Sequence, residues 1–156
     1  RHYEHKEIGY NYRMSNICAG IGRGQLKVLD KRIEKKTNIY ERYKKSFEGI
    51  PEIEMQPYMA NSKPNHWLSA IILDKTSKIK PINIIEALEN ENIESRPIWK
   101  PMHMQPFFKD YDFITLEKEK SIAQDIFERG LCLPSDTKMT EEEQDMVIKK
   151  IKKCFE

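Results

Sequence analysis

Apolar residues recur at helical spacing over the first third of the chain. A set of them falls three, four or seven positions apart: Leu26, Leu29, Ile33, Tyr40, Tyr43 and Phe47. Such spacing places the side chains on one face of a helix, and Ser15 or Asn16 is a suitable N-cap. The pattern therefore predicts a helix from there to about Phe47. If continuous, it would be about 48 Å long at ~1.5 Å per residue, a length that suits a helix crossing between two domains.

Three glycines interrupt this helical pattern near its start. Gly20, Gly22 and Gly24 each cost about 1 kcal/mol of helix stability relative to alanine. They indicate either close backbone packing or a break near Gly22 to Gly24.

The remaining pattern predicts strands alternating with helices. The stretch HWLSAIIL is nearly all apolar, as expected of a central strand, and Thr140 with Glu143 forms a T-x-x-E capping box. In the helix that starts at Pro81, we expect Ile82, Ile85 and Leu88 to point inward. The expected strands are 54–60, 66–73, 94–98 and 130–135, and the expected later helices are 81–92, 116–129 and one that starts after Thr140. This order is typical of an α+β fold, a small sheet with helices packed on one face.

Composition narrows the class of protein. The 156 residues suit one domain or two very small ones. A net charge of +2, from 27 basic and 25 acidic residues, gives no electrostatic argument for a nucleic-acid or membrane partner. The three cysteines form no C-x-x-C pair, and no run of 18 apolar residues exists. We expect a reduced, cytoplasmic setting. The chain starts without Met, so we expect it to be part of a longer protein.

The histidines and glycines give weak signals for metal or phosphate chemistry. His2 and His5 are close in sequence but have no cysteine beside them, so surface histidines are favoured over metal ligands. His66 begins the apolar strand and is expected to be structural. The Gly20-x-Gly22-x-Gly24 spacing lies on a helical pattern and does not follow a strand, so it fails the context of a phosphate-binding loop.

Two stretches are candidates for ligand binding. The first, SRPIWKPMHMQPFF, combines cations and aromatic residues with stiffening prolines; its candidates are Arg96, Trp99, Lys100, His103 and Gln105. It is either a ligand wall or a solvated loop whose aromatic residues cover a core. The second is GYNYR. In an extended segment Asn11 and Arg13 point to the same side and could donate to an anion such as phosphate; a turn with a surface ion pair is the alternative.

The chain resembles the DegT/DnrJ/EryC1/StrS family of sugar aminotransferases, in particular the branch that acts in pilin or protein glycosylation. The resemblance covers essentially all 156 residues, and three motifs in the family's order carry it. They are Gly9-Tyr10-Asn11-Tyr12-Arg13-Met14-Ser15 with Ala19, Gln25-Leu26 and Leu29; Arg96-Pro97 with Trp99-Lys100-Pro101-Met102-His103 and Gln105-Pro106; and Gly130-Leu131-Cys132-Leu133-Pro134-Ser135.

The resemblance implies the C-terminal small domain of a fold type I, pyridoxal-phosphate-dependent enzyme, with a long helix and a small, mostly antiparallel sheet. Residues 1–24 would belong to the large-domain and dimer interface, and residues 25–156 to the small domain. Asn11 or Arg13 would contact the cofactor phosphate of the partner in a homodimer. Arg96, Trp99, Lys100, His103 and Gln105 would wall the pocket for a nucleotide-linked 4-keto-6-deoxy sugar. The amino donor is expected to be glutamate.

One departure from the family bears on catalysis. The family's S-x-x-x-x-K stretch, which carries the Schiff-base lysine, is missing, and Lys45-Ser46-Phe47 does not fit it. The sequence therefore offers no catalytic residue, and we expect the chain alone to be inactive. The alternative is a free-standing, non-catalytic module of the same fold that binds a ligand or dimerises.

Overall fold

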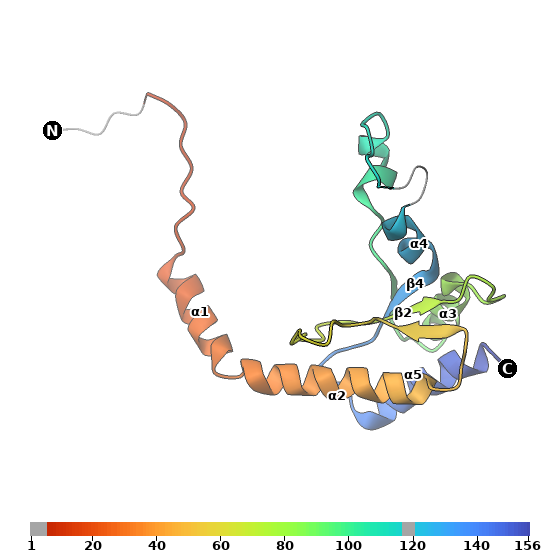
Figure 1. The fold of residues 1–156 in the computed structure, drawn as a ribbon. Coiled ribbons are helices and arrows are strands. Elements are labelled where there is room, and N and C mark those ends of the chain that lie inside the picture. Colours follow the sequence, from red (N-terminus) through yellow and green to blue (C-terminus); the bar gives the residue numbers. More distant parts are fainter. Residues whose placement is uncertain (1–5, 117–120) are drawn as a thin grey trace. The chain divides into compact units, whose positions relative to one another are not determined.

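The computed structural model describes residues 6–116 and 121–156, and the chain divides into two compact units, Arg1–Arg32 and Ile33–Glu156. Figure 1 shows its elements in chain order. They are α1 (Asn16–Leu26), α2 (Leu29–Phe47), β1 (Ile53–Met55), β2 (Ser69–Leu73), α3 (Pro81–Glu89), β3 (Arg96–Pro97), the 3-10 turns η1 (Met102–Met104) and η2 (Pro106–Phe108), α4 (Ile122–Arg129), β4 (Gly130–Leu133) and α5 (Glu141–Lys153).

The first unit contains α1, whose start follows the predicted cap. The Ser15 side chain accepts a hydrogen bond from the Cys18 amide at 3.2 Å, which satisfies one of the unpaired amides of the first turn. No residue of α1 is buried. A β-carbon at Gly20, Gly22 or Gly24 would have no neighbouring atom within 4 Å among the described residues. Close packing of these glycines is therefore not seen among the residues that the structure describes.

The helical pattern up to Phe47 is divided, as one of the two alternatives for the glycines predicted, because a turn separates α1 from α2. The Lys27 amide donates to the Gly24 carbonyl at 3.3 Å and the Val28 amide to the Gln25 carbonyl at 3.1 Å. These are tighter i to i−3 bonds, which end an α-helical ladder. The break therefore lies just after the glycines and not among them.

The second unit is built on a four-stranded sheet in the order β1-β2-β4-β3. All three strand pairs are antiparallel, which confirms the predicted sheet type. In β2 and β4, Ile71 pairs with Leu131 and Ser69 with Leu133. The chain's last strand therefore lies at the centre of the sheet, beside β2.

The core of this unit lies on one face of the sheet. Alternate strand residues point to the same face, and the side chains of β2 and β4 on this face meet buried side chains from α2, α3 and α5. The cluster contains Ile39, Tyr43, Phe47, Ile71, Leu73, Ile84, Ile85, Leu88, Leu131, Leu133, Val147, Ile148 and Ile151. The α+β class, with helices packed on one face, is thereby confirmed.

All four strands are shorter than predicted, two of them for local backbone reasons. β2 begins at Ser69 because His66 has a positive φ of 45°, a left-handed conformation that no extended strand contains. β1 ends at Met55, two residues before Pro57, and proline has no amide to donate to a ladder.

The helices agree better with the sequence pattern. Thr140 and Glu143 form the capping box at the start of α5 as predicted. In α3, Ile85 and Leu88 are buried as expected, but Ile82 is 54% exposed and Ile84 is buried in its place. The α4 helix begins at Ile122; residues 117–120 of the longer predicted helix lie outside the described residues.

Candidate functional site

A pocket of about 540 Å³ lies beside β3 and the end of β4. It brings together three of the five residues expected to bind substrate, Arg96, Trp99 and Lys100. Its other walls come from the segment before β2, the residue before β3, α4, β4 and the chain after β4; they include Trp67, Leu68, Ser95, Phe127, Cys132 and Ser135.

Two exposed tryptophans lie at this pocket. The rings of Trp67 and Trp99 stack with centroids 5.9 Å apart and planes inclined by 27°, and their exposed fractions are 61% and 65%. Trp99 was expected here from the sequence, whereas Trp67, which lies inside the apolar HWLSAIIL run, was not. The signal that could have found it is its size, since a tryptophan at the open end of a strand is an uncommon surface residue.

The cations of the pocket have different environments. Arg96 pairs with Glu94, its Nε and Nη2 lying 2.8 and 2.5 Å from Oε1. The ion pairs found among the described residues do not include Lys100, which is exposed. Lys100 is therefore the cation better placed to meet a bound anion, while Arg96 would first have to exchange its partner.

His103 and Gln105 do not line the pocket. The His103 ring stacks on Phe113 with centroids 3.7 Å apart, and its Nε2 is buried without a partner among the described residues. Gln105 donates from Nε2 to the Lys100 carbonyl at 3.3 Å. Both residues thus shape the loop 99–113, which combines the two alternatives left open by its sequence: one end lines a pocket and the other packs on its own aromatic rings.

Lys36 of α2 holds two walls of the pocket together. Its Nζ donates to the Trp67 carbonyl at 2.9 Å and also to the Ser135 carbonyl. Burial lowers the pKa of Lys36, although nearby Asp136 opposes the shift. The Ser135 hydroxyl accepts from the Ser69 amide at 3.0 Å and donates to the Leu133 carbonyl at 2.9 Å. The pocket floor is therefore rigidly tied to β2 and β4.

Two further polar side chains, Cys132 and Ser95, line the pocket. Burial raises the pKa of Cys132, so its thiol stays protonated and is a poor nucleophile. The Ser95 hydroxyl is buried without a hydrogen-bond partner among the described residues. An unpaired buried hydroxyl costs free energy, so a polar ligand atom reaching it would remove that cost.

Asn11 and Arg13 belong to the first unit, where both are exposed. The Asn11 Oδ1 accepts from the Arg13 amide at 3.0 Å and from its Nε at 3.5 Å. The two side chains therefore lie together through an Asx-type contact, in which the asparagine oxygen accepts from the amide two residues on, as in a turn. The Asn11 Nδ2 and the Arg13 Nη groups remain as donors, a set that fits a phosphate.

Residues 6–116 and 121–156 also bear on metal binding and membrane insertion. No group of three or more His, Cys, Asp or Glu side chains could hold a metal ion there, and His2 and His5 lie outside this range. None of the helices found in the same residues is long and apolar enough to cross a membrane.

Comparisons with known proteins agree over nearly the whole chain. The family model described as the DegT/DnrJ/EryC1/StrS aminotransferase family matches residues 1–152. EpsN of Bacillus subtilis is 45% identical over 154 residues, covering 99% of this chain and 39% of that protein. The GDP-perosamine synthase of Vibrio cholerae is 33% identical over 157 residues, covering 99% of this chain and 41% of that protein.

Solved structures share the fold. Spr1654 of Streptococcus pneumoniae, solved in its PMP form, is 25% identical with a TM-score of 0.78, covering 90% of this chain and 35% of that one. DesV of S. venezuelae is 19% identical with a TM-score of 0.81, covering 100% of this chain and 40% of that one. This chain therefore spans about two fifths of the length of the relatives it matches.

Proposed function

Because the chain belongs to the DegT/DnrJ/EryC1/StrS aminotransferase family, we propose that it is the C-terminal part of a pyridoxal-phosphate-dependent sugar aminotransferase. The complete enzyme transfers an amino group from glutamate to a nucleotide-linked 4-keto-6-deoxy sugar. The observation that carries this proposal is the match over 99% of the chain to a GDP-perosamine synthase, together with a pocket that gathers Arg96, Trp99 and Lys100.

The cofactor contact comes from the first unit. Asn11 and Arg13 would hold the phosphate of pyridoxal phosphate bound by the partner subunit of a homodimer, since their remaining donors suit a phosphate dianion. Bound pyridoxal phosphate supplies the electron sink that amino transfer needs. The two side chains position that phosphate and move no proton.

The substrate contact comes from the pocket of the second unit. Trp99 and the neighbouring Trp67 offer flat surfaces for the sugar or the base, and Lys100 offers a cation to the diphosphate. Arg96 contributes once it releases Glu94. His103 and Gln105 act indirectly, by holding the loop that carries Lys100.

The chain alone is inactive in this proposal, because no lysine in it matches the one that binds the family's cofactor. A fusion tests this: the part of EpsN that precedes its matching segment, joined to residues 1–156. With glutamate and a GDP-linked 4-keto-6-deoxy sugar, the fusion should form 2-oxoglutarate, whereas the 156-residue chain should form none. A folded fusion that binds pyridoxal phosphate but aminates no nucleotide sugar would overturn the proposal.

Substitutions in the same fusion separate the two contacts. Arg13→Met should weaken pyridoxal phosphate binding about tenfold or more, because a charge-assisted hydrogen bond contributes ~1.5–3 kcal/mol. Trp99→Ala should raise KM for the nucleotide sugar and leave cofactor binding unchanged. Arg23→Met, which removes an exposed cation of α1, is the matched control and should change neither.

A further inference from the structure

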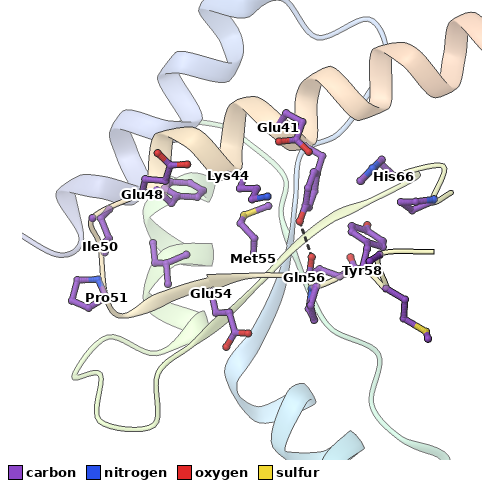
Figure 2. Close-up of a pocket in the computed structure, with 18 residues that line it drawn as sticks. Glu41, Lys44, Glu48, Ile50, Pro51, Glu54, Met55, Gln56, Tyr58 and His66 are labelled. Carbon is purple, nitrogen blue, oxygen red and sulfur yellow. Dashed lines mark hydrogen bonds between the residues drawn. The ribbon is translucent and has the colours of Figure 1, made fainter. Parts of the chain in front are cut away.

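The second unit has another, larger hollow, which is separate from the pocket proposed to bind the sugar. It is a groove of about 990 Å³ between the second half of α2 and the segment 50–60 that contains β1. Figure 2 shows side chains of the helix and of the strand facing each other across it. None of the residues proposed to bind cofactor or sugar lines this groove.

The floor of the groove is apolar and aromatic. Phe47 is buried beneath it, and half-buried Ile50, Ile53 and Met55 continue the surface along the strand. At one end the rings of Tyr40, Tyr58 and His66 pack together; the Tyr40 centroid lies 5.3 Å from that of Tyr58 and 4.4 Å from that of His66. The Tyr40 hydroxyl donates to the Gln56 carbonyl at 2.7 Å, which fixes the strand to the helix.

His66 has an unused polar atom at this end of the groove. The residue is only 7% exposed, and its Nδ1 has no hydrogen-bond partner among the described residues. Burial lowers the pKa of His66, with a smaller opposing effect from Glu41. The ring is therefore neutral, and a donor from an incoming molecule would satisfy a nitrogen that the chain leaves unpaired.

The rim of the groove is acidic. Glu41, Glu48 and Glu54 are exposed around it, against the single cation Lys44. The ion pairs described within residues 6–116 and 121–156 do not use these three carboxylates. A positively charged occupant would therefore gain attraction without breaking an ion pair of these carboxylates, although Glu54 is also one of the charges that raise the pKa of Arg129.

The groove also has a free strand edge. β1 is the terminal strand of the sheet. The Gln56 amide donates to the Ala70 carbonyl, and the Asp74 amide donates to the Glu52 carbonyl. Bonded pairs alternate along an antiparallel ladder, so the Met55 N–H and C=O, opposite Ile71, point away from β2. An exposed edge of this kind can pair with another extended chain.

We propose that this groove binds an extended segment of another polypeptide, one that carries Lys or Arg side chains among apolar ones. The main chain of the segment pairs with the Met55 edge, and its apolar side chains cover the floor formed by Ile53 and Met55. Its alternate side chains point to the opposite face of the strand, where a cation meets Glu54, and cations at the ends of the segment meet Glu41 and Glu48. Recognition by strand addition combines main-chain affinity with side-chain specificity in this way. The site is independent of cofactor and sugar, so it goes beyond the proposed aminotransferase function.

The probe is an acetylated and amidated heptapeptide of alternating lysine and valine, added to the 156-residue chain labelled with ¹⁵N. The amides of Glu54, Met55 and Gln56 should show the largest shifts. Substituting Glu48→Lys and Glu54→Lys together should weaken binding at least tenfold. Both residues are exposed, so the fold should be kept, and an unchanged spectrum elsewhere verifies it.

Two controls make the test decisive. The same peptide with glutamate in place of lysine should not bind the original chain. The paired substitution Glu86→Lys and Glu89→Lys makes the same charge change at exposed sites of α3 and should leave the affinity within twofold. No binding of the lysine peptide, shifts centred outside the groove, or equal weakening by both charge reversals would each overturn the proposal.

Discussion

The two units of this chain hold their apolar side chains in opposite ways. In residues 33–156, three helices and a sheet enclose a core in which Tyr43, Ile71 and Leu131 are fully buried. In the described part of residues 1–32, the large apolar side chains Ile17, Ile21 and Leu26 are each more than 60% exposed. The second unit thus buries its apolar side chains within itself, whereas the described residues of the first unit leave an apolar face exposed, of the kind that marks an interaction surface.

Because of this difference, substitutions in the second unit should mainly affect stability, whereas those in the first should mainly affect the proposed cofactor contact. The second unit can fold by burial within itself, because its apolar surface is removed from water by its own elements. The first unit, with α1 and the Asn11–Arg13 pair, gains no comparable burial among the described residues. Matched substitutions in the two units should therefore have unequal effects.

The largest expected difference comes from truncating apolar side chains. Leu131→Ala should destabilise the chain by about 2–5 kcal/mol, since it leaves a cavity at a fully buried site. Ile21→Ala in α1 should change the free energy of unfolding by less than about 0.5 kcal/mol. Urea unfolding followed by tryptophan fluorescence measures both. Equal losses would show that the first unit is packed after all.

Glycines give the next largest contrast. A β-carbon at Gly130 would lie 2.6 Å from the Ile126 carbonyl oxygen and 2.6 Å from the Ile98 Cγ1, so Gly130→Ala should cost about 1–3 kcal/mol through overpacking. Gly22→Ala meets open space and should instead raise the helicity of α1, by up to about 1 kcal/mol of helix propensity. Thermal unfolding and far-ultraviolet circular dichroism distinguish the two. A Gly130→Ala protein as stable as the parent contradicts the close approach.

Helix caps should differ more modestly. Thr140→Ala removes one half of the capping box of α5, a helix that contributes Val147, Ile148 and Ile151 to the core, and should cost ~1 kcal/mol of global stability. Ser15→Ala removes the cap of α1 and should only increase local fraying. Hydrogen exchange of the α1 and α5 amides reports both effects; global destabilisation by Ser15→Ala would be the contrary result.

The smallest effect concerns pH and again falls in the second unit. Burial lowers the pKa of His66 in the folded chain below its ordinary value, so the unfolded chain binds the proton more readily. The contribution of neutral His66 to stability is full above the unfolded pKa of ~6.5 and is lost as the pH falls through the folded pKa. His66→Gln should flatten the loss of stability between pH 7 and pH 5 in urea titrations. An unchanged slope would assign that loss to other groups.

Local sequence signals predicted the parts of the fold that depend on neighbours in the chain. The capping box at Thr140 and the cap at Ser15 are set by residues three apart. The division between α1 and α2 was predicted slightly too early, near Gly22 to Gly24, because no proline or glycine lies at the turn itself, which falls at Lys27 and Val28. The strand ends were missed because the left-handed turn at His66 has no strong sequence mark.

The candidate site, too, could be predicted from local sequence only in part. Arg96, Trp99 and Lys100 could be found together because they are nearly adjacent in sequence. Trp67 and Ser135 join them only through the pairing of β2 with β4, in which Ser69 lies opposite Leu133. Lys36 joins through the packing of α2. Contacts between distant segments depend on the whole fold, so local patterns do not reveal them.

The sheet order has a consequence for how the chain folds as it is made. β4 (Gly130–Leu133) is synthesised after all the other strands, yet it lies between β2 and β3. A ribosome that adds ~5–20 residues per second therefore releases β1 and β2 seconds before their central neighbour exists. During that interval the inner edge of β2 is open to pairing with other chains. Synthesis of β4 thus decides whether the sheet closes on itself or is captured in an aggregate.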